Sequence, residues 1–159
     1  MTWEAGSIRA GALVGYVASR TMDQATTWFY GRQTEASKQR EEELAPGGTL
    51  VQLGKQLGQA AGRDLTDQQA ARVGLAVHRT FGVLYGMGAA ALVKRGVRPI
   101  TAGLAVGTTA WVIVDEGTAL SQFTAYPMES HMRGVVGHGT LGLAVGVLLS
   151  LLGKRQGRP

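Results

Sequence analysis

Apolar and charged residues are segregated along the chain, and four long blocks contain no Asp, Glu, Lys or Arg. The blocks are 10–19, 80–93, 99–114 and 134–153. Only the last is as long as the roughly 18–20 residues that a membrane-spanning helix needs. The other three can span a bilayer only if their helices carry ionisable residues inside the apolar region, where such side chains are costly unless they face the protein interior. We therefore predict helices at about 7–30, 73–94, 99–121 and 133–153.

These helices predict an all-α fold, a four-helix transmembrane bundle that forms a single membrane domain over residues 1–159. Cations flank the helices at one end: Arg9, Lys94, Arg95, Arg98, Lys154, Arg155 and Arg158. By the positive-inside rule this end is cytoplasmic, which places both termini inside the cell. Aromatic residues expected at the opposite end form an interfacial belt: Trp28, Phe29, Tyr30, Phe123 and Tyr126. We expect no cleavable signal peptide, since the first apolar block continues into Arg20 and Asp23.

A polar insert, 31–72, separates the first two predicted helices and should be extracytoplasmic. Residues 37–44 form a charged helical run that ends before Pro46-Gly47-Gly48. Residues 49–61 place apolar side chains at helical spacing, which predicts an amphipathic helix: Leu50, Leu53, Leu57 and Ala60 or Ala61. Thr66 or Asp67 should cap the helix that follows. We favour a solvated connector with one interfacial helix over a lid on the bundle.

Composition narrows the function without naming it. The chain of 159 residues has no cysteine, which excludes disulfides, thiolate metal sites and cysteine nucleophiles. Its net charge of +5 is explained by the flanks of the helices, and no basic stripe interleaved with aromatics suggests nucleic-acid binding. Catalytic and cofactor motifs are missing from the sequence, so we expect neither an enzyme nor a bound cofactor.

Glycines recur at four-residue spacing in every predicted helix and should form packing seams, where small residues let helices approach closely in lipid. The pairs are Gly11/Gly15, Gly82/Gly86, Gly103/Gly107 and Gly142/Gly146. The first and third helices also share the spacing to Asp23 and Asp115, and the second and fourth share the spacing to His78 and His138. This register indicates an internal repeat, a pseudo-twofold pair of helical hairpins. An accidental match in a glycine-rich chain is the alternative.

Ionisable residues inside the predicted spans fall at a common depth. Asp23, His78, Asp115 and His138 each lie roughly 7–9 Å outward from the middle of their helices, at about 1.5 Å per residue. Arg20, Arg79 and Glu116 lie within a turn of that level, and His131 lies at its mouth. We expect these side chains to form one polar layer that faces the bundle interior.

Three interpretations of this layer stay open. The side chains could lock the helices together through Asp–His and Asp–Arg hydrogen bonds, as intramembrane charges usually do. They could respond to protons, since histidine titrates near neutrality. They could also bind a metal, in which case Asp23, His78, Asp115 and His138 would be the donors.

Short motifs along most of the chain resemble the YagU-like inner-membrane proteins, a bacterial domain family of unknown function. The resemblance rests on short motifs in chain order. The first are the three glutamates 41–43 followed by Pro-Gly-Gly at 46–48, and His78 followed by Tyr85-Gly86. The later ones are Gly103, Gly107, Trp111, Asp115-Glu116, Tyr126-Pro127, His131, Gly134 and Gly137-His138. It implies a small polytopic protein of the bacterial plasma membrane with a polar outer loop. The family supplies no catalytic residues to transfer.

Together these observations predict a polytopic inner-membrane protein whose outward Asp/His layer stabilises the bundle and responds to pH. One alternative is a small cation or proton transporter, or a metal-binding membrane subunit, that uses the same residues. Another is a structural accessory subunit of a membrane complex. The expected partners are the lipid bilayer and a second copy or another membrane protein, because four short helices with glycine seams leave little room for an enclosed pathway.

Overall fold

The computed structural model describes residues 7–117 and 125–156, apart from the side chains of 116–117 and 155–156. Every regular element in these ranges is a helix, which confirms the all-α prediction. The elements are α1 (Ile8–Tyr30), α2 (Glu35–Leu44), α3 (Thr49–Ala60), α4 (Asp67–Lys94), α5 (Pro99–Ala110), the π-helix η1 (Trp111–Gly117) and α6 (Met128–Gln156). Of the residues used in the predictions, Phe123, Arg158 and 118–121 lie outside the described residues.

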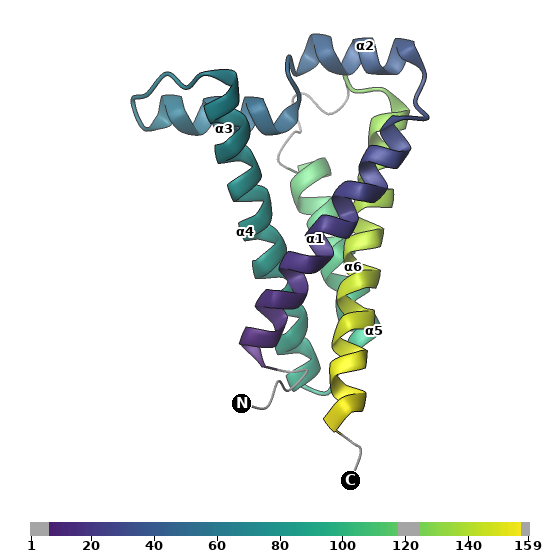
Figure 1. Cartoon of the computed structure of the whole chain (residues 1–159). Coiled ribbons are helices and arrows are strands. Elements are labelled where there is room, and N and C mark those ends of the chain that lie inside the picture. Colours follow the sequence, from purple (N-terminus) through teal and green to yellow (C-terminus); the bar gives the residue numbers. More distant parts are fainter. Residues whose placement is uncertain (1–6, 118–124, 157–159) are drawn as a thin grey trace.

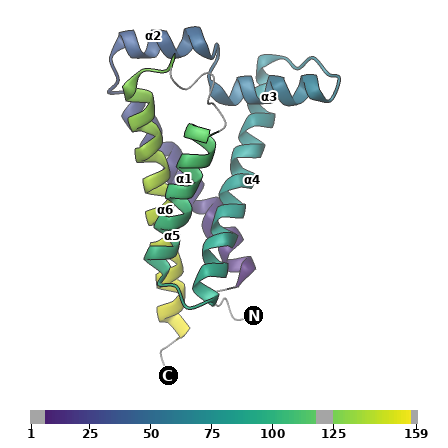
Figure 2. The ribbon, with the colours of Figure 1, turned by 180° about the vertical axis from the view of Figure 1, so that it is seen from behind.

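Four of these helices form an antiparallel bundle (Figures 1 and 2). Helix α1 packs against α4 and α6, and α5 packs against α6 and α4, so each helix has two neighbours. The start of α1 and the end of α6 lie at the same end of the bundle, and α2 lies at the other end. The chain therefore crosses the length of the bundle four times.

One described helix, α6, is long and apolar enough to cross a membrane by length and composition. Its apolar segment, Met128–Lys154, spans 27 residues with a mean hydropathy of 2.0. Helices α1 and α4 have the necessary length but not this hydropathy, because polar residues such as Asp23 and Arg79 interrupt them. The apolar segment Pro99–Asp115 is shorter than a regular spanning helix.

The third helix of the bundle departs from the regular α-helix predicted over 99–121. It begins at Pro99, whose fixed φ suits the first turn of a helix, and stays α-helical to Ala110. From Trp111 to Gly117 the backbone is a π-helix. Such wide turns are rare and recur at functional positions. Here the π-helix carries Asp115, one of the predicted ionisable residues.

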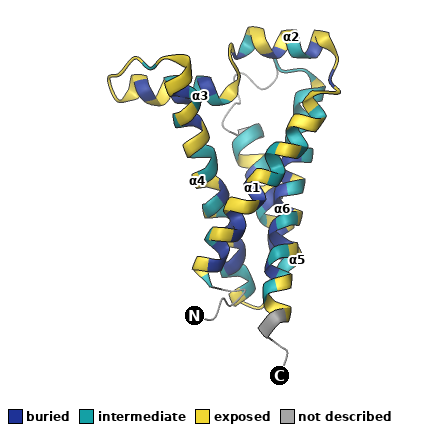
Figure 3. Ribbon diagram, in the orientation of Figure 1, coloured by how far each residue is buried: buried dark blue, intermediate teal, exposed yellow. Residues whose placement is uncertain are grey.

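Buried residues gather where the helices of the bundle meet (Figure 3). Many of the buried residues are small, and many large apolar residues are exposed. Alanines dominate the core, and the largest fully buried side chains are Leu141, Leu149, Val145 and Ser19. In contrast, Leu13 is 54% exposed, Ile113 56% and Leu143 51%. Many large apolar side chains thus lie outside the core, where they forgo the roughly 1.5–3 kcal/mol that burial of each contributes in water.

The predicted seam glycines all lie where two helices meet. A Cβ added at Gly11 would lie 2.6 Å from the carbonyl oxygen of Gly86, and a Cβ at Gly86 would lie 2.6 Å from the Cα of Gly15. In the other hairpin, a Cβ at Gly142 would lie 2.6 Å from the carbonyl oxygen of Gly103. Gly82, Gly107 and Gly146 make equally close approaches to the facing helix. The helices thus touch through their backbones, as expected for seams of small residues.

The polar insert folds into α2 and α3. Thr34 caps α2, and Thr66 caps α4 in a capping box with Gln69, as the sequence predicts for this position. Helix α2 lies across the end of the bundle above α1 and α6 (Figure 1). The favoured interpretation of the whole insert as a solvated connector is wrong for α2, since Glu41 of this helix is buried and bonded to α6.

Candidate functional site

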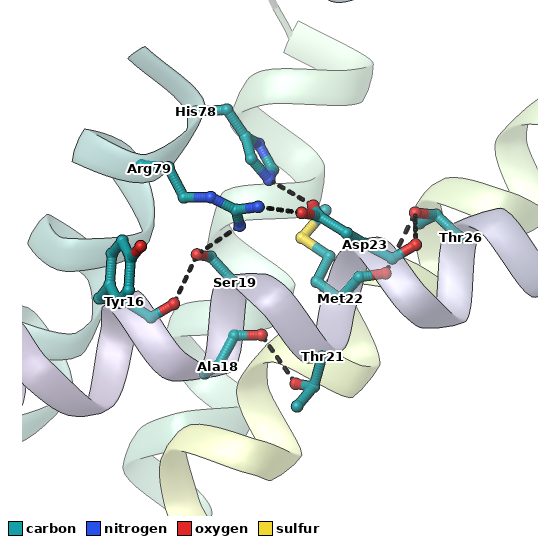
Figure 4. A network of polar contacts seen from close by, with 9 residues as sticks. All are labelled: Tyr16, Ala18, Ser19, Thr21, Met22, Asp23, Thr26, His78 and Arg79. Atoms are coloured by element: carbon teal, nitrogen blue, oxygen red, sulfur yellow. Dashed lines mark hydrogen bonds and ion pairs between the residues drawn. The ribbon is translucent and has the colours of Figure 1, made fainter. Parts of the chain in front are cut away.

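The first ionisable cluster joins α1 to α4 (Figure 4). His78 Nε2 lies 2.9 Å from Asp23 Oδ1, and the Arg79 guanidinium is paired with the other carboxylate oxygen. Arg79 also donates a hydrogen bond of 2.8 Å to Ser19 Oγ. Ser19 and Asp23 stand four residues apart, so they share the face of α1 that meets α4. The Asp23 carboxylate therefore has a permanent cation beside it as well as a histidine.

The second cluster joins η1 to α6 and has no such cation among the described residues. His138 Nε2 lies 3.4 Å from Asp115 Oδ1, and the His138 side chain is only 7% exposed. The phenol of Tyr85 on α4 is close enough to Asp115 to sense its charge. His138 Nδ1 and Trp111 Nε1 are buried and have no hydrogen-bond partner among the described residues.

Both pairs lie in the half of the bundle nearer α2, as the depth estimate predicts, but they remain separate. In each hairpin the aspartate pairs with the histidine of the same hairpin: Asp23 with His78, and Asp115 with His138. The described residues contain no group of three or more His, Asp or Glu side chains that could hold a metal. The four-donor metal site on Asp23, His78, Asp115 and His138 is therefore wrong for this structure, since its donors sit on two different helix pairs.

Of the other predicted members of the layer, Arg20 does not join either pair. Arg20 is exposed, because it lies about 100° around α1 from Ser19, away from α4. The prediction of an inward Arg20 is wrong. His131 is half-buried near the start of α6. Glu116 belongs to η1, but its side chain lies outside the described residues.

A third polar network, which the sequence reasoning missed, connects α2 to α6. Glu41 accepts hydrogen bonds from Gln33, Ser130 and Arg133, each at 2.6 Å. Arg133 also donates to Gln33 at 2.6 Å, and Gln33 donates to Ser37 at 3.1 Å. We refer to Gln33, Ser37, Glu41, Ser130 and Arg133 as the cap network. A usable signal was the four-residue spacing of Ser37 and Glu41, which places two polar side chains on one face of α2, next to Gln33 just before the helix begins.

A pocket of about 310 Å³ lies beside the cap network. Glu41, Arg133 and Tyr126 line it together with residues from the end of α1, including Thr26 and Tyr30. Burial, and next the nearby Glu41 carboxylate, raise the pKa of the Tyr126 phenol. Tyr126 therefore keeps its hydroxyl proton at physiological pH. Because Glu41 and Arg133 neutralise each other, the wall that they form is polar but carries no net charge.

Comparisons with known proteins yield no match: no family model, curated protein or solved structure corresponds to this chain.

Proposed function

We propose that the chain is a polytopic protein of the bacterial plasma membrane, with four spanning helices and both termini in the cytoplasm. We propose further that its second hairpin is a pH-responsive element. The resemblance to the YagU-like proteins stays a prediction that agrees with this assignment. The distribution of side-chain sizes carries the membrane proposal, and the contrast between the two Asp–His pairs carries the pH response.

The outward faces of the bundle support residence in lipid. Large apolar side chains lie exposed on each helix of the bundle: Leu13 on α1, Leu84 on α4, Leu104 on α5 and Leu143 on α6. Exposed large apolar side chains on all four helices fit outer faces that contact acyl chains. The closest contacts between helices are made at glycines, which is the packing expected where no hydrophobic effect drives helices together.

Charge at the two ends supports the orientation. Arg9, Lys94, Arg95, Arg98 and Lys154 lie at the end opposite α2, without an acidic residue among the described positions near them. The polar insert at the other end balances its cations with acids. Trp28 and Tyr30 lie exposed at that end, at the level expected of an outer aromatic belt.

The Asp115–His138 pair supports the pH response. Among the described residues, this carboxylate is paired with His138 and with no Lys or Arg side chain. In the low dielectric of a bundle interior, an uncompensated carboxylate is costly. We therefore expect the second hairpin to be more stable at acidic than at alkaline pH. The Asp23 pair should contribute little to this response, because Arg79 stays charged throughout.

Thermal unfolding of the detergent-solubilised or nanodisc-embedded protein between pH 5.5 and 8 tests the proposal. The double variant Asp115→Asn with His138→Gln should lose an acid-stabilised component of about 1 kcal/mol, or roughly 2–4 °C in the unfolding midpoint. The matched control, Asp23→Asn with His78→Gln, should keep the pH dependence of the unmodified chain. Equal pH profiles for the unmodified chain and the Asp115/His138 variant would contradict the pH response.

Arg20 favours a second candidate function, that of an oligomeric or accessory subunit. This guanidinium is exposed near the middle of α1, between the exposed Val17 and Gln24, and has no hydrogen-bond or ion-pair partner among the described residues. Facing lipid at that depth it would be costly, whereas a neighbouring helix with polar groups would satisfy it. Measurement of the solubilised mass tests this. The unmodified chain should be larger than a monomer, and Arg20→Leu should reduce its mass.

A further inference from the structure

Helix α3 lies across the outer part of α4, so its two long sides face in opposite directions along α4 (Figures 1 and 2). Small residues make its close contacts. Gly54 meets the backbone of Ala70 on α4, and a Cβ on Gly58 would lie 2.7 Å from the side chain of Leu65, which precedes α4. Glycine contacts of this kind hold the two helices at close range and fix the rotation of α3 about its own axis.

The ion pair between Lys55 and Asp67 shows which way α3 is turned. Lys55 Nζ lies 2.7 Å from the carboxylate of Asp67, the first residue of α4 and its outermost position. The Lys55 side of α3 therefore faces away from the bundle. At about 100° per residue, Leu50, Leu53 and Leu57 lie roughly 140–160° around the helix from Lys55. This leucine stripe must face along α4 towards the bundle.

The face that packs on α4 is not the leucine stripe. Val51, Gly54 and Gly58 are buried, and Gly54 meets Ala70 of α4, whereas Leu57 is 41% exposed and Leu50 and Leu53 are partly buried. An amphipathic helix thus buries one part of its apolar arc in the protein and leaves the other part uncovered. Something outside the described residues must meet this stripe if its apolar area is to be removed from water.

The uncovered stripe continues an apolar surface that the proposed membrane span already presents. Leu50 meets α4 at Gly74 through its backbone. Phe81 comes seven residues after Gly74 and therefore lies on the same side of α4; it is 43% exposed, and Leu84 near it is 49% exposed. The stripe and the outward face of α4 therefore meet at an inner corner below α3, while Lys55 and Gln59 lie on the opposite side.

We infer that α3 lies in the outer interface of the bilayer, parallel to its plane, with Leu50, Leu53 and Leu57 at the boundary between headgroups and acyl chains. The partner is the lipid surface, and the inference rests on the proposed membrane location. An in-plane helix with apolar residues on one side and polar residues on the other is the established form of such anchors. Because α3 packs on the outer turns of α4, the depth of α3 in the bilayer fixes the depth of His78 and Arg79 below the membrane surface.

Spin-label accessibility in vesicles of phosphatidylcholine and phosphatidylglycerol tests this inference. The chain has no cysteine, so single labels can be placed without removing native thiols. Labels at Leu57→Cys and Gln59→Cys sit two residues apart on opposite faces of α3, and both native residues are exposed. We expect the Leu57 label to collide several-fold more often with oxygen than with a water-soluble nickel chelate, and the Gln59 label to show the reverse. Leu53→Cys, on the same stripe, repeats the measurement if Leu57→Cys does not assemble.

A third label, Leu143→Cys on α6, separates the two proposals. If the Leu143 label is in lipid while the Leu57 and Gln59 labels are both in water, the inference about α3 is wrong and the membrane location stands. If all three labels are in water, the membrane location itself is wrong. A Leu57 label shielded from oxygen and nickel alike would place a protein surface over the stripe and would also overturn the inference.

Discussion

The two hairpins of the bundle contain the same parts but differ beside their ionisable pairs. Each has a glycine seam and one Asp–His contact in the half nearer α2. Arg79 follows His78 in the first hairpin, and Gly139 follows His138 in the second. Ser19 and Trp111 occupy the position four residues before each aspartate. One hairpin therefore has a permanent cation held by a hydroxyl, and the other has neither.

This difference separates two roles for the same pair of residue types. With Arg79 bonded to both Asp23 and Ser19, the first pair stays neutralised whatever the state of its histidine, and it serves as a lock between α1 and α4. Among the described residues, the Asp115 carboxylate is paired with His138 alone. The indole nitrogen of Trp111 beside it is buried and has no hydrogen-bond partner in the same set of residues. Whether an intramembrane Asp–His pair is structural or titratable is thus decided by its neighbours.

The largest effect should come from filling a glycine seam. Gly86→Leu would drive a side chain into the backbone of Gly15, and we expect a loss of at least about 3 kcal/mol in unfolding free energy, at the upper end of overpacking costs. Thermal unfolding in detergent measures it. Gly88→Leu is the matched control two residues away, where an added Cβ meets nothing within 4 Å. Equal stability of the two variants would argue against backbone contact at the seam.

Removal of the carboxylate should affect the first hairpin more than the second. Asp23→Asn leaves Arg79 without its anion, and we expect a loss of about 2 kcal/mol, reduced from the cost of a fully buried pair because Asp23 is 37% exposed. Asp115→Asn at pH 8 should lose less, because it removes an uncompensated charge. The double variant Asp23→Asn with Arg79→Gln should recover part of the loss. Additive losses would mean that the two side chains are not coupled.

The cap network should contribute a smaller and local effect. Glu41→Gln leaves Arg133 without its carboxylate, and we expect roughly 1–2 kcal/mol, since α2 can detach and let water reach the guanidinium. Hydrogen exchange of residues 33–44 should accelerate while the bundle stays protected. Glu43→Gln is the control, because its pair with Arg40 is exposed and surface pairs contribute little. Faster exchange throughout the bundle would show that the cap holds both hairpins together.

The smallest expected effect is a change in pH dependence, and it is the sharpest test of the comparison. Gly139→Arg with Trp111→Ser supplies Asp115 with the cation and hydroxyl that Asp23 has, and an added Cβ at Gly139 meets nothing within 4 Å. We expect the pH dependence of the unfolding midpoint to flatten, while loss of the half-buried indole lowers the midpoint at every pH. A pH dependence that persists in this variant would separate the response from the charge of Asp115.

The sequence predicts which ionisable residues lie at a common depth better than it predicts the partners of each residue. The common depth of Asp23, His78, Asp115 and His138 predicted one polar layer with Asp–His hydrogen bonds as one interpretation, and the structure forms two such contacts in separate helix pairs. It also predicted Arg20 as a member of the layer, because depth along a helix is a matter of residue count. The side that Arg20 faces depends on how α1 is rotated against α4, and a count does not contain that information.

The sequence by itself determined the helices, their caps and the small-residue seams, because each of these follows from periodicity and spacing within one segment. The Thr66 cap of α4 and the four-residue spacing of the seam glycines can each be predicted from one segment of the chain. Only the tertiary structure decided that Asp23 gains Arg79, that Asp115 sits on a π-helix, and that Glu41 meets Arg133 across the bundle. These outcomes depend on the rotation and relative height of packed helices, which arise when all of the contacts form together.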